Sequence, residues 1–175
     1  MGAPNDEAAG AAWRRTHTCG ELRAGHVGQE VTLNGWVHAR RDHGGIYFID
    51  LRDRYGITQV LVPMEVADAV RLGTEFVLSV RGRVLARGPG QQNRERPTGE
   101  IEVQAQVLEV LAGSPTPPIE VAGGSEPAVE TRLRYRFIDL RRESMRSNLL
   151  FRARFISALR RAFEAQDFVE VETPI

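Results

Sequence analysis

The sequence predicts a mainly β-sheet domain, a small closed barrel of five strands with one short helix, followed by a linker and the start of an α+β unit. Three observations support this prediction. Short segments of alternating apolar and polar residues, separated by turn residues, run from about 27 to 111. Prolines and glycines then dominate 112–129. Beyond 143, apolar residues recur at three- and four-residue intervals, as in an amphipathic helix.

The expected strands are 31–37, 46–51, 57–62, 75–85 and 101–107, each bounded by polar or glycine-containing turns. Gly44 and Gly45 predict a tight turn between the first two strands, and Gly82 predicts a bulge or bend in the fourth. A short helix is expected between Pro63 and Gly73. Five strands with a helix between the third and fourth follow the plan of an OB-fold barrel, which binds nucleic acid across its second and third strands.

The chain is expected to have four parts, 1–15, 16–111, 112–142 and 143–175. These are a disordered leader, the OB-fold domain, a linker with a hinge, and the start of a second domain. In the last part, Ser144 is expected to cap a long helix with Phe151, Phe155, Leu159 and Phe163 on one face, and a strand should follow at 168–172. One helix and one strand close no core, so we expect the second domain to be truncated.

The composition excludes several classes of chemistry. All 23 basic residues are arginine, so neither a phosphate-binding Walker lysine nor a Schiff-base lysine can occur in these 175 residues. Cys19 is the single cysteine, which excludes an intramolecular disulfide and a cysteine-based metal site. Apolar runs are short and interrupted by charges. We therefore expect no membrane span, no secretory signal, no metal site and a cytoplasmic location.

Local residue types favour a nucleic-acid site on the second and third strands. Phe48 is expected to point outward as a stacking ring for an unpaired base, beside Gln59, whose amide can donate and accept toward a uracil edge. Arg40 and Arg41 at the mouth of this face could clasp phosphates, and Glu102 on the last strand could read the donor edge of a guanine. Alternation alone leaves open that Phe48 belongs to the core and Gln59 is an ordinary solvated sheet residue.

Several segments resemble the bacterial-type aspartyl-tRNA synthetases, a family of class II aminoacyl-tRNA synthetases. Residues 35–53, 56–60 and 98–103 resemble the anticodon-binding barrel of that family. Residues 130–142 resemble its hinge, and the helix that leads to 168–174 resembles class II motif 1. The resemblance implies an OB-fold that binds a tRNA anticodon, joined to a class II catalytic domain.

The resemblance also implies roles for single residues. Phe48 matches the ring that stacks on the central anticodon uridine, Gln59 the amide that reads this uridine, and Glu102 the acid that reads the first anticodon base. Arg40 and Arg41 match the family's arginine pair, although Ala39 stands where a further arginine often precedes that pair. His43 stands where enzymes strict for the aspartate tRNA often carry leucine. This implies relaxed specificity, with the asparagine tRNA accepted as well.

Members of this family attach aspartate to tRNA with ATP and Mg²⁺ and act as homodimers. Phe155, Leu159 and Pro174 match the part of motif 1 that builds the dimer interface. Motifs 2 and 3 do not occur in the sequence, so we expect this chain to bind tRNA without catalysis and to hold no cofactor itself. Two alternatives are a general single-strand-binding OB module and a sister synthetase for asparagine or lysine.

Overall fold

A computed structural model describes residues 14–67 and 72–174 of the chain. The expected leader lies almost wholly outside these described residues. The chain divides into two compact units, Met1–Pro117 and Pro118–Ile175. Each is considered by itself.

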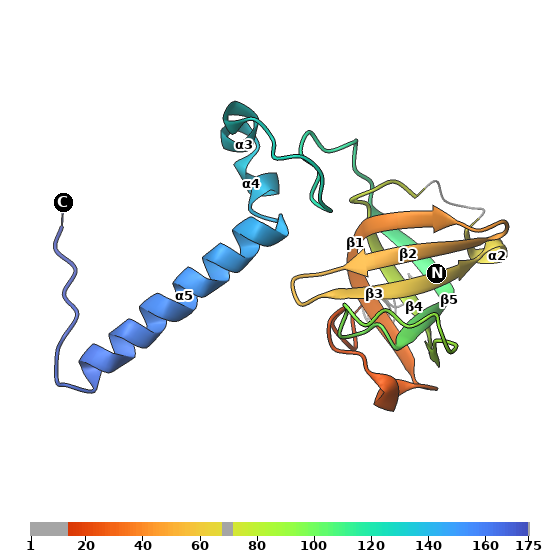
Figure 1. Cartoon of the computed structure of the whole chain (residues 1–175), viewed down its shortest axis with the longest axis horizontal. Coiled ribbons are helices and arrows are strands. Elements are labelled where there is room, and N and C mark those ends of the chain that lie inside the picture. Colours follow the sequence, from red (N-terminus) through yellow and green to blue (C-terminus); the bar gives the residue numbers. More distant parts are fainter. Residues whose placement is uncertain (1–13, 68–71, 175) are drawn as a thin grey trace, which may run out of the picture. The chain divides into compact units, whose positions relative to one another are not determined.

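The first unit is a closed five-stranded barrel (Figure 1). Its elements are the 3-10 helix η1 (Ala24–His26), β1 (Glu30–Asp42), β2 (Ile46–Arg52), β3 (Ile57–Pro63), α2 (Met64–Ala67), β4 (Val77–Ala86) and β5 (Ile101–Ala112). The strands follow each other round the barrel in the order β1-β2-β3-β5-β4. All pairings are antiparallel except that of β3 with β5. The OB-fold architecture predicted from the sequence is therefore confirmed.

Alternation along the strands places one row of side chains in the barrel interior and the other outside. Buried aliphatic residues from every strand form one core. The strand residues that form it are Val31, Leu33, Val37, Ile49, Leu51, Val60, Val62, Leu78, Val80, Val84, Ile101, Val103 and Ala105. The opposite row on β2 and β3, which includes Phe48 and Gln59, is thereby left to face outward.

Both glycine features expected in the strands are present. Gly44 and Gly45 have φ angles of 62° and 112°, in the left-handed region that favours glycine, and they close the β1–β2 hairpin. At Gly82 the pairing of β4 with β5 changes register. A Cβ on Gly82 would lie only 2.1 Å from the Gln104 carbonyl oxygen, so the two strands approach too closely there for any larger residue.

The β2–β3 turn is tied to the segment that precedes β1. The buried carboxylate of Asp53 accepts hydrogen bonds from the backbone N–H groups of Cys19, Tyr55 and Gly56, at 2.9, 2.7 and 3.1 Å. The Thr58 hydroxyl donates to the Cys19 carbonyl at 2.7 Å. These hydrogen bonds fix the β2–β3 turn against the segment before β1 at one end of the barrel.

The described residues of the second unit, 118–174, form the helices α3 (Val129–Arg134), α4 (Arg136–Asp139) and α5 (Glu143–Glu164). The fully buried Asp139 carboxylate forms ion pairs with Arg132, Arg136 and Arg142, at 3.2, 2.6 and 3.4 Å. Burial alone would raise the pKa of Asp139, but the hydrogen bonds from Arg132 and Arg142 hold it below its ordinary value. This cluster joins the short helices to the start of α5.

Two predictions for the second unit were wrong in detail. The long helix begins at Glu143 after Arg142, without a side-chain cap, and Ser144 lies inside its first turn. Residues 168–172 form no strand, because no neighbouring strand in the described part of this unit offers backbone groups to pair with. Phe168 instead packs its ring edge-on against Phe163, with ring centroids 5.5 Å apart.

Candidate nucleic-acid interface

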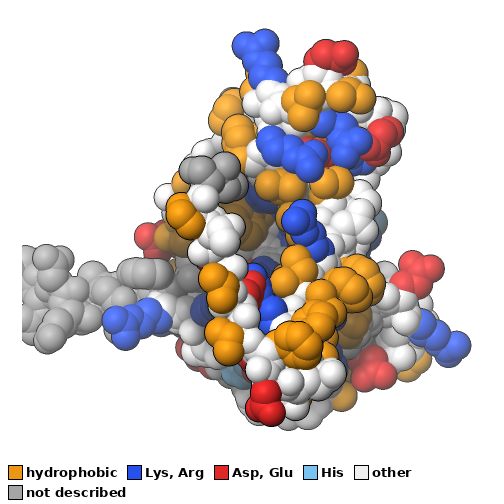
Figure 2. Space-filling model, turned by 90° about the vertical axis from the view of Figure 1, so that its left-hand side faces the viewer, with side chains coloured by type: hydrophobic (Ala, Val, Ile, Leu, Met, Phe, Trp, Pro, Cys, Tyr) orange, Lys and Arg blue, Asp and Glu red, His pale blue; other side chains and the backbone are white. Residues whose placement is uncertain are grey.

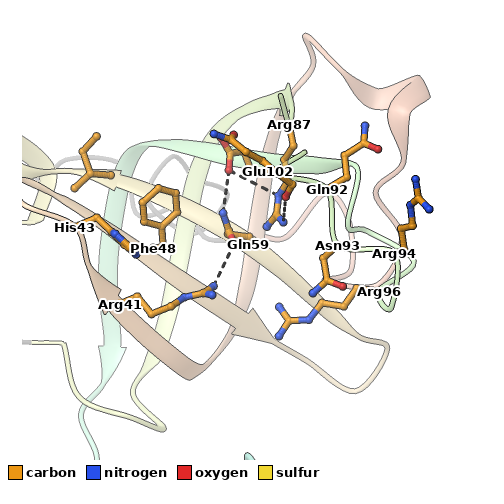
Figure 3. A pocket seen from close by; sticks show the side chains of 12 residues that line it. Arg41, His43, Phe48, Gln59, Arg87, Gln92, Asn93, Arg94, Arg96 and Glu102 are labelled. Atoms are coloured by element: carbon orange, nitrogen blue, oxygen red, sulfur yellow. Dashed lines mark hydrogen bonds and ion pairs between the residues drawn. The ribbon is translucent and has the colours of Figure 1, made fainter. Parts of the chain in front are cut away.

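A hollow of about 920 Å³ opens on the outer face of the barrel unit (Figure 3). We call it the outer hollow. Its walls come from the end of β1, from β2, β3 and β5, and from the loop at 87–99. The lining residues are Arg41, His43, Ile46, Phe48, Gln59, Arg87, Gln91, Gln92, Asn93, Arg94, Arg96 and Glu102. The lining contains four arginines and one glutamate, so its formal charge is positive, although the whole chain has a formal net charge of zero.

An aromatic pair forms one end of the outer hollow. Phe48 is half-buried on the outward row of β2, as the alternation predicted, and its cross-strand partner on β1 is Arg41. The His43 and Phe48 rings lie at 90° to each other, with ring centroids 5.3 Å apart. This perpendicular contact is a favourable aromatic arrangement, and it places two rings at one end of the outer hollow.

A chain of polar contacts crosses the floor of the outer hollow. Arg41 Nη2 donates to Gln59 Oε1 at 3.2 Å, and Gln59 Nε2 donates to Glu102 Oε2 at 3.0 Å (Figure 3). Arg87 Nε lies 3.8 Å from the same carboxylate oxygen of Glu102, and their side chains are only 8% and 14% exposed. Burial lowers the pKa of the Arg87 guanidinium below its ordinary value, and the Glu102 carboxylate opposes that effect.

A buried carboxylate anchors two of the arginines. Asp50 is 3% exposed and accepts hydrogen bonds from Arg41 at 3.2 Å and from Arg96 at 2.9 Å. Arg41 belongs to β1 and Arg96 to the 87–99 loop. Asp50 therefore ties a strand to a loop, and Gln59 is its cross-strand neighbour on β3.

The match to family models covers both units. Residues 31–111 match a model described as an OB-fold nucleic acid binding domain, and residues 128–175 match one described as class II tRNA synthetases of the D, K and N group. Sequence relatives match nearly the whole chain. An aspartate–tRNA(Asp/Asn) ligase from Rubrobacter xylanophilus is 56% identical over 165 residues, which are 92% of this chain and 28% of that protein. The chain therefore carries an OB-fold nucleic-acid-binding domain followed by the start of a class II tRNA synthetase domain.

Two further proteins agree with this assignment. The aspartate–tRNA(Asp/Asn) ligase of Paracoccus denitrificans is 49% identical over 92% of this chain and 28% of its own length. The crystal structure of asparaginyl-tRNA synthetase from Pyrococcus horikoshii shows 30% identity and a TM-score of 0.76, over 91% of this chain and 37% of that one. The chain thus spans 28% of the length of the two ligases.

Five of the six predicted anticodon residues lie in the outer hollow, namely Arg41, His43, Phe48, Gln59 and Glu102. Arg40 does not line it. Neighbouring side chains on a strand point to opposite sides, and the Arg40 guanidinium lies over the Tyr47 ring instead, 5.3 Å from its centroid. The arginine pair is therefore split between two environments.

The 87–99 loop contributes to the site, although none of its residues was among the predicted site residues. Arg87, Asn93 and Arg96 turn toward the strands and form a wall of the outer hollow (Figure 3). The loop's run of amides and arginines, 91–96, is the signal that could have been used, because these side chains suit base edges and phosphates.

The described residues offer little support for other site types. No group of three or more His, Cys, Asp or Glu side chains in 14–67 and 72–174 is placed to hold a metal ion. In the same ranges, no helix has the length and apolar character to cross a membrane. The buried thiol of Cys19 lies against the Asn34 carbonyl, and burial raises its pKa.

Proposed function

We propose that the barrel binds the anticodon loop of a tRNA as part of an aspartate–tRNA ligase. One observation carries this proposal: a stacking ring, an amide and a carboxylate, namely Phe48, Gln59 and Glu102, share one positively charged hollow. Single-stranded RNA is recognised by stacking unpaired bases on aromatic rings and by hydrogen bonds to their edges. The outer hollow supplies both kinds of contact.

Five of the lining residues are given roles that follow from their chemistry. Phe48 stacks on the central uridine and Gln59 bonds its edge, since an amide offers a donor and an acceptor side by side. Glu102 accepts from the N–H groups of a guanine at the first anticodon position. Arg41 and Arg94 contact phosphates, which position the loop without reading it.

We also propose that this recognition is relaxed at the third anticodon base. Two relatives carry the name aspartate–tRNA(Asp/Asn) ligase, which covers both tRNAs. The anticodons of these tRNAs differ only in the third base. His43 lines the outer hollow against Phe48, and we assign it to the base that follows the central uridine.

The whole enzyme would attach aspartate to the tRNA with ATP and Mg²⁺, in the cytoplasm. We assign no site for these reactants to this chain, and the chain alone should form no aspartyl-adenylate. The homodimer interface is proposed along α5 and the segment after it. Phe155 and Leu159 are 58% and 45% exposed there, and a groove of about 350 Å³ lies between Leu159, Phe163 and Phe168. Figure 2 shows hydrophobic side chains at the surface among the arginines.

Fluorescence anisotropy with labelled anticodon stem-loops tests the proposal. The 175-residue chain should bind the aspartate anticodon GUC and the asparagine anticodon GUU within about tenfold of each other. It should bind GAC, in which the central uridine is replaced, much more weakly. Phe48→Ala should weaken GUC binding by about 1–3 kcal/mol, because one stacked base is lost. Tyr55→Ala removes an exposed ring outside the outer hollow and should leave binding unchanged.

The same measurement separates the alternatives. Equal binding of all three stem-loops would indicate a general single-strand-binding module and refute the anticodon roles. Tighter binding of GUU, or of the lysine anticodon UUU, than of GUC would indicate a sister synthetase. At least hundredfold weaker binding of GUU than of GUC would end the relaxed interpretation of His43 while keeping the anticodon proposal.

A further inference from the structure

A free glutamine amide is an ambiguous reader of pyrimidines. Its carbonyl accepts and its NH₂ group donates, and a half-turn about its last bond exchanges the two. At ring positions 4 and 3, uracil presents an acceptor (O4) beside a donor (N3–H), whereas cytosine presents a donor (N4–H) beside an acceptor (N3). An unrestrained amide can therefore pair with either base by turning over, and Gln59 alone would not select uridine.

Both polar atoms of Gln59 are held by partners of opposite chemistry. Arg41 donates to Oε1 at 3.2 Å, and Nε2 donates to Glu102 at 3.0 Å (Figure 3). A guanidinium can only donate and an ionised carboxylate can only accept. Turning the amide over would set N–H against the guanidinium and a carbonyl oxygen against the carboxylate. The partners thus permit one orientation.

These partners are themselves held in place. Arg41 shares the buried carboxylate of Asp50 with Arg96, and the Glu102 carboxylate is paired with Arg87 at the edge of the same floor. The backbone of Gln59 lies in β3 between β2 and β5, the strands that carry Asp50 and Glu102. The amide is therefore orientated before any ligand arrives.

The locked amide can still bind a base. An amide has two donor hydrogens and two carbonyl lone pairs, and the bonds to Arg41 and Glu102 use one of each. One donor and one acceptor remain, in a fixed order, on a side chain that lines the outer hollow. Once Phe48 and the direction of the RNA chain set the plane of the base, this order matches only one of the two pyrimidines.

We propose that Arg41 and Glu102 are positioning residues that lock the Gln59 amide and so make it select uracil over cytosine at the central anticodon position. This inference rests on the proposed anticodon function. It adds a second role to both residues, because each acts on the central base through Gln59 as well as on the RNA directly. Selectivity for the pyrimidine then belongs to a group of three side chains.

Two stem-loops that differ only in the central pyrimidine, GUC and GCC, test the lock by fluorescence anisotropy with the 175-residue chain. Glu102→Gln keeps the side-chain size but can either donate or accept, so the Gln59 amide loses one of the two partners that oppose its turning over. The ratio of the two affinities should fall about 10- to 100-fold, the equivalent of one hydrogen bond to a charged group. Both anticodons begin with guanine, so the loss of any contact between Glu102 and that base cancels in the ratio of the two affinities.

Arg41→Met removes the other partner and should also lower the ratio. Arg94→Met is the matched control, since Arg94 lines the outer hollow without a hydrogen bond or ion pair to Gln59. It should weaken binding of both stem-loops equally and leave the ratio unchanged. Urea unfolding of each variant checks that the barrel remains folded.

The outcomes distinguish the lock from the proposed function. If the unaltered chain prefers GUC but the ratio stays the same in Glu102→Gln and Arg41→Met, the lock is refuted and anticodon binding stands. If the unaltered chain binds GUC, GCC and GAC alike, anticodon recognition itself fails. A lower ratio in both variants, with Arg94→Met unchanged, establishes the lock.

Discussion

Replacing Asp53 should loosen the end of the barrel where the β2–β3 turn meets the segment before β1. The carboxylate, 5% exposed, accepts hydrogen bonds from Cys19, Tyr55 and Gly56. Asp53→Ala leaves the Cys19 N–H buried without its acceptor, which costs about 1–3 kcal/mol. The N–H groups of Tyr55 and Gly56 lie in a partly exposed turn and can turn to water, so each adds about 0.5–1 kcal/mol. We expect Asp53→Ala to lower the free energy of unfolding by about 3 kcal/mol.

Asp53→Asn should cost less, about 1–2 kcal/mol, because its oxygen still accepts from the turn while its NH₂ group faces the Cys19 N–H. Urea unfolding followed by tryptophan fluorescence measures both values. Asp42→Ala is the control, since Asp42 also accepts from a turn N–H, that of Gly44, but at an exposed site. The reasoning is refuted if Asp53→Ala is no less stable than Asp42→Ala, or if the Asn variant is less stable than the Ala variant.

Three further outcomes are expected. Gly82→Ala should destabilise the barrel by about 1–3 kcal/mol in urea, because its Cβ would meet the Gln104 carbonyl oxygen at 2.1 Å, whereas Gly25→Ala, with open space, should be neutral. Burial and the neighbouring Arg52 lower the pKa of His38, so stability should be full above the ordinary value of 6.5 and decline as the pH falls below it. His38→Gln should flatten that decline, and an unchanged pH profile would contradict this. Cys19 should react with Ellman's reagent only on unfolding, because burial raises its pKa, and rapid labelling of the folded chain would contradict its buried position.

Local patterns were sufficient to predict the barrel. Alternation located all five strands, and the glycines at 44, 45 and 82 marked the turn and the bulge, since each signal depends only on nearby residues. The prediction of a strand at 168–172 was wrong because a strand needs a neighbouring strand to pair with. Apolar alternation in the sequence does not show whether such a neighbour is present. Ser144 was wrong as a cap because the helix begins at Glu143, two residues before the start that a cap at Ser144 would give.

The candidate site was predictable one residue at a time but not as an arrangement. Phe48, Gln59 and Glu102 could be proposed from their residue types and positions on strands. Their hydrogen-bond order could not, because the Gln59–Glu102 contact joins residues 43 positions apart and depends on the parallel pairing of β3 with β5. Arg40 was misplaced because adjacent arginines look equivalent in a sequence, whereas a strand separates them onto two sides.

The ion-pair cluster around Asp139 lowers the number of arginines in the stretch 132–142 that can readily pair with RNA phosphates. Affinity for RNA falls with added salt in proportion to the number of phosphates that the protein neutralises, since each contact releases a condensed counterion. Arg132, Arg136 and Arg142 already pair with Asp139, and Arg132 and Arg142 pair with Glu126 as well. Such a guanidinium must give up a carboxylate before it can take a phosphate. A titration of RNA binding against salt should therefore give a shallower slope than the arginine content of this stretch suggests.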